Sequence, residues 1–257
     1  MIKNLMLTAA FAFVAGSAGA VTLNSSSSLG STNYLNNFNG GSTYYQSWTG
    51  ANQISDGSST FWAYCIDPKT NTAWGSNVYT TASLNSFLNT PYGASNTSGY
   101  AQQMASGGYN NLSYGIQNAA LVESKLTTLF SHAYADSLSD PSGVKAAAFG
   151  FTVWEIMGQS SYGRLTGALR SIGSYPYGGD ALQTQIDAYI TALNTNSWGN
   201  VGGANLSSAR NYTYTVYFDP APHSAQNFLR ATAVPEPGSL ALAGLALAGV
   251  FWMRRKR

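Results

Sequence analysis

The last two dozen residues most constrain what this chain can become, because they join a short apolar segment to a basic end. Leu240 to Met253 contains no charged residue, and the four residues that follow are all basic. Such a segment enters a membrane while the positive side chains stay on the cytoplasmic side. It would form about 21 Å of helix, which is shorter than a ~30 Å hydrocarbon core. To span the membrane, the side chains of Trp252 and the arginines would therefore have to reach the cytoplasmic boundary of the bilayer. We predict a short transmembrane helix with a basic stop-transfer cluster: Arg254, Arg255, Lys256 and Arg257.

A second feature lies directly before this segment. Pro235, Glu236 and Pro237 form an extended, helix-breaking tripeptide, and Gly238 and Ser239 after it are small enough to enter a protease cleft. This order of motif, short apolar span and basic tail resembles the PEP-CTERM sorting signal of Gram-negative bacteria. The resemblance implies that an exosortase in the inner membrane recognises Pro-Glu-Pro and processes the tail. The protein would then pass to the cell surface or extracellular matrix.

The amino terminus has the pattern of a signal peptide. Lys3 supplies the positive region, Leu5 to Ala15 is apolar, and Ala18 to Ala20 offers small residues for cleavage by signal peptidase after Ala20. We therefore predict three parts: a signal peptide at 1–20, a single ectodomain at 21–233, and the sorting signal at 234–257. The chain is exported and held transiently at the inner membrane by its tail.

Composition narrows the class of the ectodomain. The formal charge of the chain is +2, but five of its basic residues lie in the two signals, so the ectodomain is nearly neutral and slightly acidic. It therefore lacks the basic surface that nucleic-acid binding requires. Charged residues are 9% and aromatic residues 13% of the chain, a combination that argues against a disordered tail. Cys65 is the one cysteine, so stability cannot come from an internal disulfide.

Periodicity predicts an α+β fold with a central helical block. Ser25 to Ser28 reads as flexible, and the rest of 21–60 as short strands joined by turns such as Asn39-Gly40. The expected strands are Phe61–Ile66, Thr72–Thr80, Asn211–Phe218 and a short exit strand before Val234. The expected helices are Leu84–Leu88, Gln117–Ala135, Asp140–Met157 and Asp180–Leu193, and 89–111 is expected to be a surface loop. In the third helix Asp140 would cap and Pro141 would fill the first turn, and 146–154 is apolar enough to be buried.

Residues suited to catalysis are few. Cys65, His132 and Asp136 could form a hydrolase triad on paper, but nothing in the sequence joins them, and we interpret His132 as an exposed side chain. His223 lies in a proline-flanked loop without metal-ligand spacing, and no acidic cluster suits calcium. Asp67, Glu123 and Glu155 are the carboxylates that a glycosidase could use, but their spacing identifies no pair. We expect no cofactor and no metal.

Two segments resemble the thioester domain of bacterial surface adhesins. Tyr64 to Asp67 reads Y-C-I-D, which matches the family's Y-C-[IVF]-[DN] strand, and Ala147 to Glu155 reads A-A-F-G-F-T-V-W-E, which is similar to its T-Q-x-A-[IV]-W helix. The resemblance implies a fold in which a cysteine thiol condenses with a glutamine carboxamide and releases ammonia. The resulting thioester would bind an amine on a surface molecule covalently.

The match is incomplete at the position that carries the chemistry. Cys65 matches the thioester cysteine, and Val153 and Trp154 match the end of the helix motif. Thr152 replaces the alanine, and Gly150 occupies the position of the glutamine. Glycine has no carboxamide, so no thioester can form there. The other glutamines considered, Gln159 and Gln117, lack the family's spacing. We therefore predict a thioester-domain-like fold in which Cys65 is a small buried side chain.

Three classes of function stay open. The first, which we favour, is an exported envelope or biofilm-matrix protein that acts by binding or structure, with a matrix polysaccharide or surface ligand as partner. The second is a covalent adhesin that uses Cys65, and the third is a secreted polysaccharide hydrolase. The tyrosine-rich strand Tyr212 to Phe218 could also pair edge to edge between molecules.

Overall fold

A closed antiparallel barrel forms the base of the molecule. The computed structural model describes residues 20–36, 44–67, 76–91, 100, 118–159, 161–167, 169–173, 180–219, 225–235 and 238. Its strands are β1 (Ala20–Asn36), β2 (Tyr44–Ser55), β3 (Thr60–Cys65), β4 (Ser76–Ser83), β5 (Tyr212–Phe218) and β6 (Phe228–Ala233). They follow one another around the barrel in the order β1-β2-β3-β6-β5-β4, and β4 closes on β1. The last two strands thus insert between the early strands β3 and β4.

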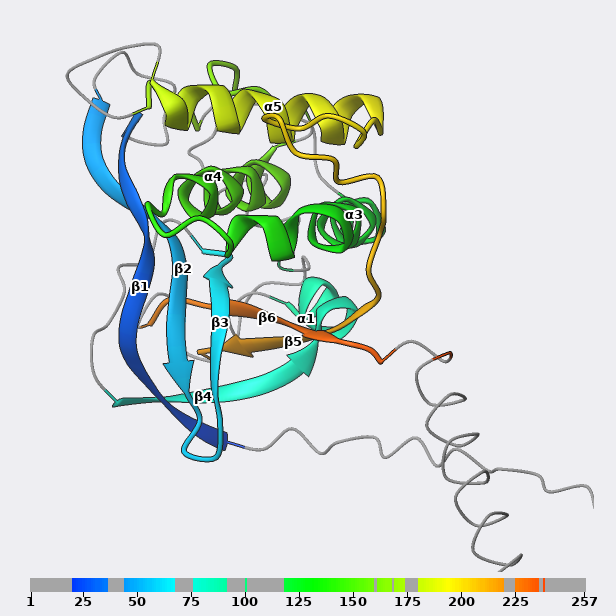
Figure 1. The fold of residues 1–257 in the computed structure, drawn as a ribbon. Coiled ribbons are helices and arrows are strands. Elements are labelled where there is room, and N and C mark those ends of the chain that lie inside the picture. Colours follow the sequence, from blue (N-terminus) through cyan, green and yellow to red (C-terminus); the bar gives the residue numbers. More distant parts are fainter. Residues whose placement is uncertain are drawn as a thin grey trace, which may run out of the picture.

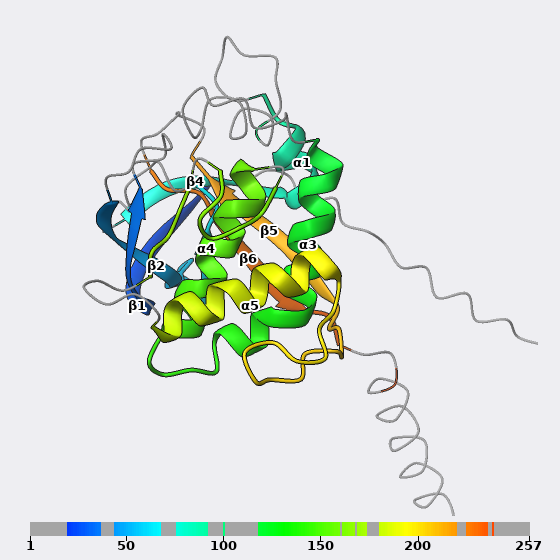
Figure 2. The same cartoon turned by 90° about the horizontal axis from the view of Figure 1, so that it is seen from above.

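Three helices form a layer above the sheet (Figure 1). They are α3 (Ala119–Ser137), α4 (Val144–Gly158) and α5 (Ala181–Thr195); the short α1 (Leu84–Asn89) lies beside α3 and β4. α4 packs directly on β1 and β2, and α5 crosses over α4 and α3 on the outer side (Figure 2). The central position of α4 agrees with its sequence, since every side chain from Ala146 to Gly158 is buried.

Short polar side chains cap the starts of three of the four described helices. Ser83 accepts a hydrogen bond from Ser86 N, Asn118 from Leu121 N and Asp180 from Gln183 N. α4 is the exception. Its N-cap is Gly143, at a φ of 76°, and it begins later than the predicted Asp140.

The predicted start of α4 at Asp140 is wrong because Asp140 forms part of a turn before the helix. Its carboxylate accepts hydrogen bonds from Ser142 N and from Ser142 Oγ, and these fold residues 140–143 back on themselves. Such a local bond competes with continuing the helix. The positive φ of Gly143 then ends the turn, so the helix starts at Val144.

The β1–β2 ribbon, residues 24–36 and 44–55, differs most from the prediction. Two long strands replace the expected series of short ones, and the serine run expected to be flexible is part of β1. Its pairing is irregular between Ser25 and Ser27, where Ser27 Oγ donates to Gln53 Oε1 at 2.7 Å. Cross-strand pairing therefore orders a segment whose composition alone indicates flexibility. The turn Asn39-Gly40 lies outside the described residues.

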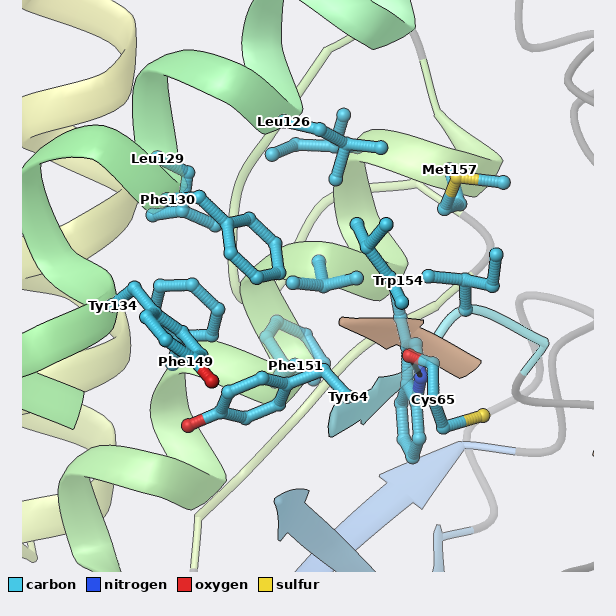
Figure 3. Close-up of a cluster of buried hydrophobic side chains, with 14 of the residues drawn as sticks. Tyr64, Cys65, Leu126, Leu129, Phe130, Tyr134, Phe149, Phe151, Trp154 and Met157 are labelled. Carbon is cyan, nitrogen blue, oxygen red and sulfur yellow. Dashed lines mark hydrogen bonds between the residues drawn. The ribbon is translucent and has the colours of Figure 1, made fainter. Parts of the chain in front are cut away.

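The hydrophobic core joins the barrel to the helices through aromatic rings. The ring of Phe149 on α4 lies 4.5 Å from that of Tyr64 on β3 and 4.9 Å from that of Phe130 on α3. The ring of Tyr189 on α5 completes the contact at 6.1 Å. Figure 3 shows how Tyr64, Phe130 and Phe149 meet between the layers. Six antiparallel strands and four helices in the described residues confirm the α+β class, while the closure into a barrel was not predicted.

β5 is a central strand of this barrel. It pairs with β4 on one side and with β6 on the other. Pairing with β4 covers Thr215 to Phe218, so the proposal of a free edge is wrong for this half of the strand, whose backbone groups are used on both sides.

Candidate functional site: Cys65 and the end of the barrel

Cys65 is the last residue of β3 and is buried, with 3% of its surface exposed. Its Sγ accepts a hydrogen bond from Asp67 N at 3.2 Å, and its carbonyl accepts one from Trp154 Nε1 at 2.9 Å. Figure 3 shows the indole of Trp154 beside the Cys65 backbone. Burial raises the pKa of the Cys65 thiol well above its usual range, and the nearby charge of Asp67 adds to this rise. The thiol is therefore protonated at neutral pH and a poor nucleophile.

The two segments that carry the thioester-domain resemblance meet in space where Trp154 contacts Cys65. Successive side chains of a strand point to opposite faces. Tyr64 points toward the helices, since its hydroxyl donates to Ser137 Oγ on α3 at 2.7 Å. Cys65, the next residue, follows on the opposite face. The indole of Trp154 nevertheless lies beside both the carbonyl and the thiol of Cys65, and its hydrogen bond to the thiol lowers the pKa of that group and so opposes part of the rise from burial.

Gly150, which occupies the glutamine position of the resembled motif, has a packing role. A Cβ added to Gly150 would lie 3.2 Å from Gly50 N and 3.5 Å from Gly50 Cα on β2. These are backbone atoms of a paired strand, which cannot turn aside as the end of a side chain can. Glycine is therefore the residue that lets α4 approach β2 closely. A glutamine here would have to displace the helix or the strand.

Gln159, one of the two alternative glutamines, belongs to a different buried group. It is fully buried at the end of α4, and its amide donates to Glu155 Oε1 and to the Leu169 carbonyl, the latter at 3.4 Å. Both contacts hold the segment after α4 against the helix. Gln117 lies outside the described residues.

Glu155 is a fully buried carboxyl that the sequence did not single out from other acids. Its Oε2 accepts a hydrogen bond from Gly163 N at 3.0 Å. Burial raises the pKa of Glu155 well above its usual value, since the charged form loses its hydration. The same burial, together with the Glu155 charge, raises the pKa of Tyr162 to about 12. One signal could have found this group: Glu155 is the one charged residue in the apolar run 146–158.

His132 and Asp136, the other members of the triad considered for Cys65, take part in separate contacts. The ring of His132 stacks on Trp198 with centroids 4.6 Å apart, and its Nδ1 donates to the Leu206 carbonyl at 2.7 Å. The interpretation of His132 as exposed is thus wrong: the ring is half-buried because the loop after α5 folds over it. Asp136 accepts from Lys145 Nζ at 2.6 Å and from the Tyr189 hydroxyl at 2.9 Å. These contacts link α3 to α4 and α5.

The three carboxylates considered for glycoside cleavage also lie in different parts of the fold. Glu123 on α3 accepts from Asn85 Nδ2 on α1 at 2.7 Å, while Glu155 lies under the segment after α4 and Asp67 follows β3. Asp67 is 1% exposed. Among the described residues, no group of three His, Cys, Asp or Glu side chains could hold a metal ion. His223 lies outside the described residues.

The folded domain begins and ends next to the two predicted signals. Ala20, after which signal peptidase is expected to cut, is the first residue of β1 and pairs with Thr80. β6 ends at Ala233, and Val234 N donates to the Asn211 carbonyl at 2.9 Å. Pro235 follows directly. Val234 alone therefore separates the last strand of the barrel from Pro-Glu-Pro.

Most of the predicted sorting signal lies outside the described residues. This holds for Glu236, Pro237, the apolar segment Leu240 to Met253 and the basic end (Arg254, Arg255, Lys256, Arg257), and likewise for the signal peptide up to residue 19. Within the part of the chain that the structure describes, no helix is long and apolar enough to cross a membrane.

Comparison with known proteins identifies the end of the chain. Residues 233–256 match the family model of the PEP-CTERM protein-sorting motif. No curated protein and no solved structure matches the chain. These comparisons give no support to the thioester-domain resemblance of the ectodomain. The matched segment implies export, transient membrane anchoring and processing by exosortase. The chain therefore carries the PEP-CTERM sorting signal of an exported, exosortase-sorted protein.

Proposed function

We propose that the barrel domain is delivered to the cell surface or extracellular matrix, where it acts by non-covalent binding or as a structural component. One observation carries this proposal: the match to the sorting motif begins at Ala233, the residue at which β6 ends. The described fold is thus complete before the motif starts, and the whole barrel is the cargo of the signal. The apolar segment Leu240 to Met253 would anchor the chain in the inner membrane until exosortase processes it.

The chemistry around the candidate residues supports a role without catalysis. Cys65 is buried and protonated, and its Sγ accepts a backbone hydrogen bond. Glu155 and Asp67 are buried, and Glu123 is hydrogen-bonded on the surface of α3. A hydrolase needs two carboxyl groups across one substrate, and a covalent adhesin needs a glutamine beside the thiol. The contacts of the described residues provide neither arrangement.

Sorting is tested by following the full chain in a Gram-negative host that has an exosortase. The variant that carries Pro235→Ala, Glu236→Ala and Pro237→Ala should keep its tail and stay in the inner-membrane fraction, while the wild type loses the tail and appears at the surface or in the medium. Pro220→Ala with Pro222→Ala is the matched control, because it removes prolines outside the motif. Equal sorting of the motif variant and the wild type would disprove the assignment.

The molecular role is tested on the purified protein Val21–Val234. Incubation with matrix polysaccharide from the same host should show binding with no release of reducing ends. The intact mass should equal that of the full sequence, and an alkylating reagent should reach Cys65 only after denaturation. Release of reducing ends would indicate a hydrolase. A mass lower by one ammonia, with Cys65 released by methylamine, would indicate a covalent adhesin.

A further inference from the structure

In the part of the chain that the structure describes, the outer half of β2 has no partner strand on one side. Tyr44 to Gly50 pairs with β1 on one side, and pairing with β3 on the other side begins only at Ala51. This half of the strand extends beyond the closed barrel and runs beside the helical layer (Figure 1). Among the described residues, no backbone group pairs with the outer side of Tyr44 to Thr49, which we name the β2 edge. Its aromatic side chains reach solvent: Tyr45 is 53% and Trp48 39% exposed.

The opposite edge of the ribbon is covered in the usual way. Tyr34 N on β1 donates to the Gly173 carbonyl at 2.9 Å, and Ile172 N donates to the Tyr34 carbonyl at 3.1 Å. Ser171 forms a bridge with Leu35. The segment after α4 thus uses the backbone groups of β1 that would otherwise face outward.

The β2 edge carries none of the features that keep strands from pairing with other molecules. Exposed edges are commonly protected by a lysine, another charge, a proline or a bulge. β1 and β2 contain no charged residue and no proline, and the pairing irregularity lies at Ser25 and Ser27, far from this half of β2. Tyr44 to Thr49 reads Y-Y-Q-S-W-T, a β-prone and uncharged run.

The edge is also held in place before any partner binds. The indole of Trp48 packs over Gly30 and Gly50, which have no side chains to push it away. On the other side of the ribbon, Gly143 and Gly150 bring α4 against the backbones of the same two glycines. A partner strand would therefore meet a pre-ordered template, which reduces the entropy lost on binding.

We propose that the β2 edge pairs with the β2 edge of a second copy of this chain, as an antiparallel continuation of the sheet. A second copy suits this edge because an uncharged strand meets no like-charge repulsion from itself, and because an antiparallel pair of identical strands is related by a two-fold axis. The register with Gln46 on this axis places Tyr44 opposite Trp48 of the second copy. Aromatic cross-strand pairs of this kind stabilise a sheet.

This pairing ends at a dimer. Both copies use the same edge, so the contact is closed and does not propagate. A contact of about five residue pairs is small, and small interfaces give weak, concentration-dependent association. On a cell surface or in a matrix the protein would be concentrated enough for such pairing to link two barrels. The inference goes beyond the proposed function, because it concerns the ectodomain without its sorting signal.

The test uses the protein Val21–Val234, which contains all six strands of the barrel and the core beneath the helices. Sedimentation at increasing concentration should show a monomer–dimer equilibrium. Gln46→Lys places like charges opposite each other on the axis and should raise the dissociation constant about tenfold or more. An equal mixture of Gln46→Lys and Gln46→Glu should restore the dimer. Leu121→Lys is the control, because Leu121 is 43% exposed on the helix α3 and lies on no strand edge.

A cysteine on the axis gives a second readout. Gln46→Cys should form a disulfide between two copies under mild oxidation, since residues opposite each other in an antiparallel pair lie about 4.5–5.5 Å apart. Leu121→Cys, on the exposed side of α3, should not. Circular dichroism would verify that each variant is folded. A strict monomer at high concentration, a dimer unaffected by Gln46→Lys, or equal cross-linking of both cysteine variants would overturn the proposal.

Discussion

At the scale of single residues, the most informative position is Gly150. In the sequence it is the place where a glutamine is missing, and this suggested a lost chemical function. In the structure its lack of a side chain allows α4 to pack on the backbone of β2 at Gly50. The missing side chain of Gly150 thus has two consequences: there is no carboxamide, and the backbones of α4 and β2 can approach closely. A glutamine at this position would require α4 to move away from the backbone of Gly50.

The variant Gly150→Gln should consequently be less stable. Its Cβ and the atoms beyond would meet the backbone of β2, and overpacking of this kind costs about 1–3 kcal/mol. The gain in helix propensity of about 1 kcal/mol offsets part of this cost. Urea unfolding of the protein Val21–Val234 measures the difference. Gly199→Gln is the control, since a Cβ at Gly199 meets no atom within 4 Å; equal stability of the two variants would contradict the packing role.

At the scale of elements, α4 stands out because its buried run 146–158 still carries one ionisable group. Glu155 accepts from Gly163 N and from the amide of Gln159, so it fixes the segment that leaves the helix. That segment continues to Ser171 and Gly173, which cover the outer edge of β1. A single buried carboxyl thus helps to hold the segment that protects one edge of the ribbon.

The raised pKa of Glu155 predicts a pH dependence with a definite sign. Above the ordinary value of 4.5, the unfolded chain releases the proton that the folded protein still holds. The unfolded state then binds fewer protons, so the free energy of unfolding falls as pH rises from 4.5 toward the pKa of the folded state, by up to about 1.4 kcal/mol per pH unit. The variant Glu155→Gln cannot ionise and should lack this decrease.

Urea unfolding between pH 4.5 and pH 8 would measure this effect. Wild type and Glu155→Gln should diverge as pH rises, in favour of the variant. Glu123→Gln makes the same chemical change on the surface of α3, where Asn85 donates to the carboxylate, and should leave the wild-type pH dependence in place. Parallel curves for wild type and Glu155→Gln would show that burial does not control the ionisation of this carboxyl.

At the scale of the whole molecule, closure of the barrel depends on pairings between distant parts of the chain. β6 pairs with β3 and with β5, and β1 pairs with both β2 and β4. The first and the last strand are thus both required, and they lie directly beside the two predicted processing sites. Export signals at both ends can be removed without taking any strand from the barrel.

A chain that ends at Asp219 should therefore fail to fold. It lacks β6, leaves the facing edges of β3 and β5 unpaired, and loses the buried side chains of Phe228 and Leu229. Thermal unfolding followed by near-ultraviolet circular dichroism should show no cooperative transition. The chain that ends at Val234 keeps all six strands and should unfold cooperatively. A cooperative transition in the shorter chain would mean that the barrel can stay open.

The sequence predicted the elements whose patterns are local. The alternation of Tyr212 to Phe218, the periodicity of α3 and α5, and the apolar run of α4 each depend on residues a few positions apart, and the structure confirms those elements. The long strands β1 and β2 were missed. Their serine, asparagine and glycine residues indicate turns on their own, and become strands only because each supplies the other's hydrogen-bond partners.

By itself, the sequence determined the destination of this protein and the identity of most of its helices and strands. Sorting signals are read as linear patterns by the export machinery, and helical and strand periodicity acts over a few residues, so both are visible without a fold. Only the tertiary structure decided that Cys65 is buried, that Gly150 is a point of contact, that the second half of β5 is paired on both sides, and that the outer half of β2 has no partner strand on one side among the residues described. Each of these depends on which distant segment lies alongside, and no local pattern encodes that neighbour.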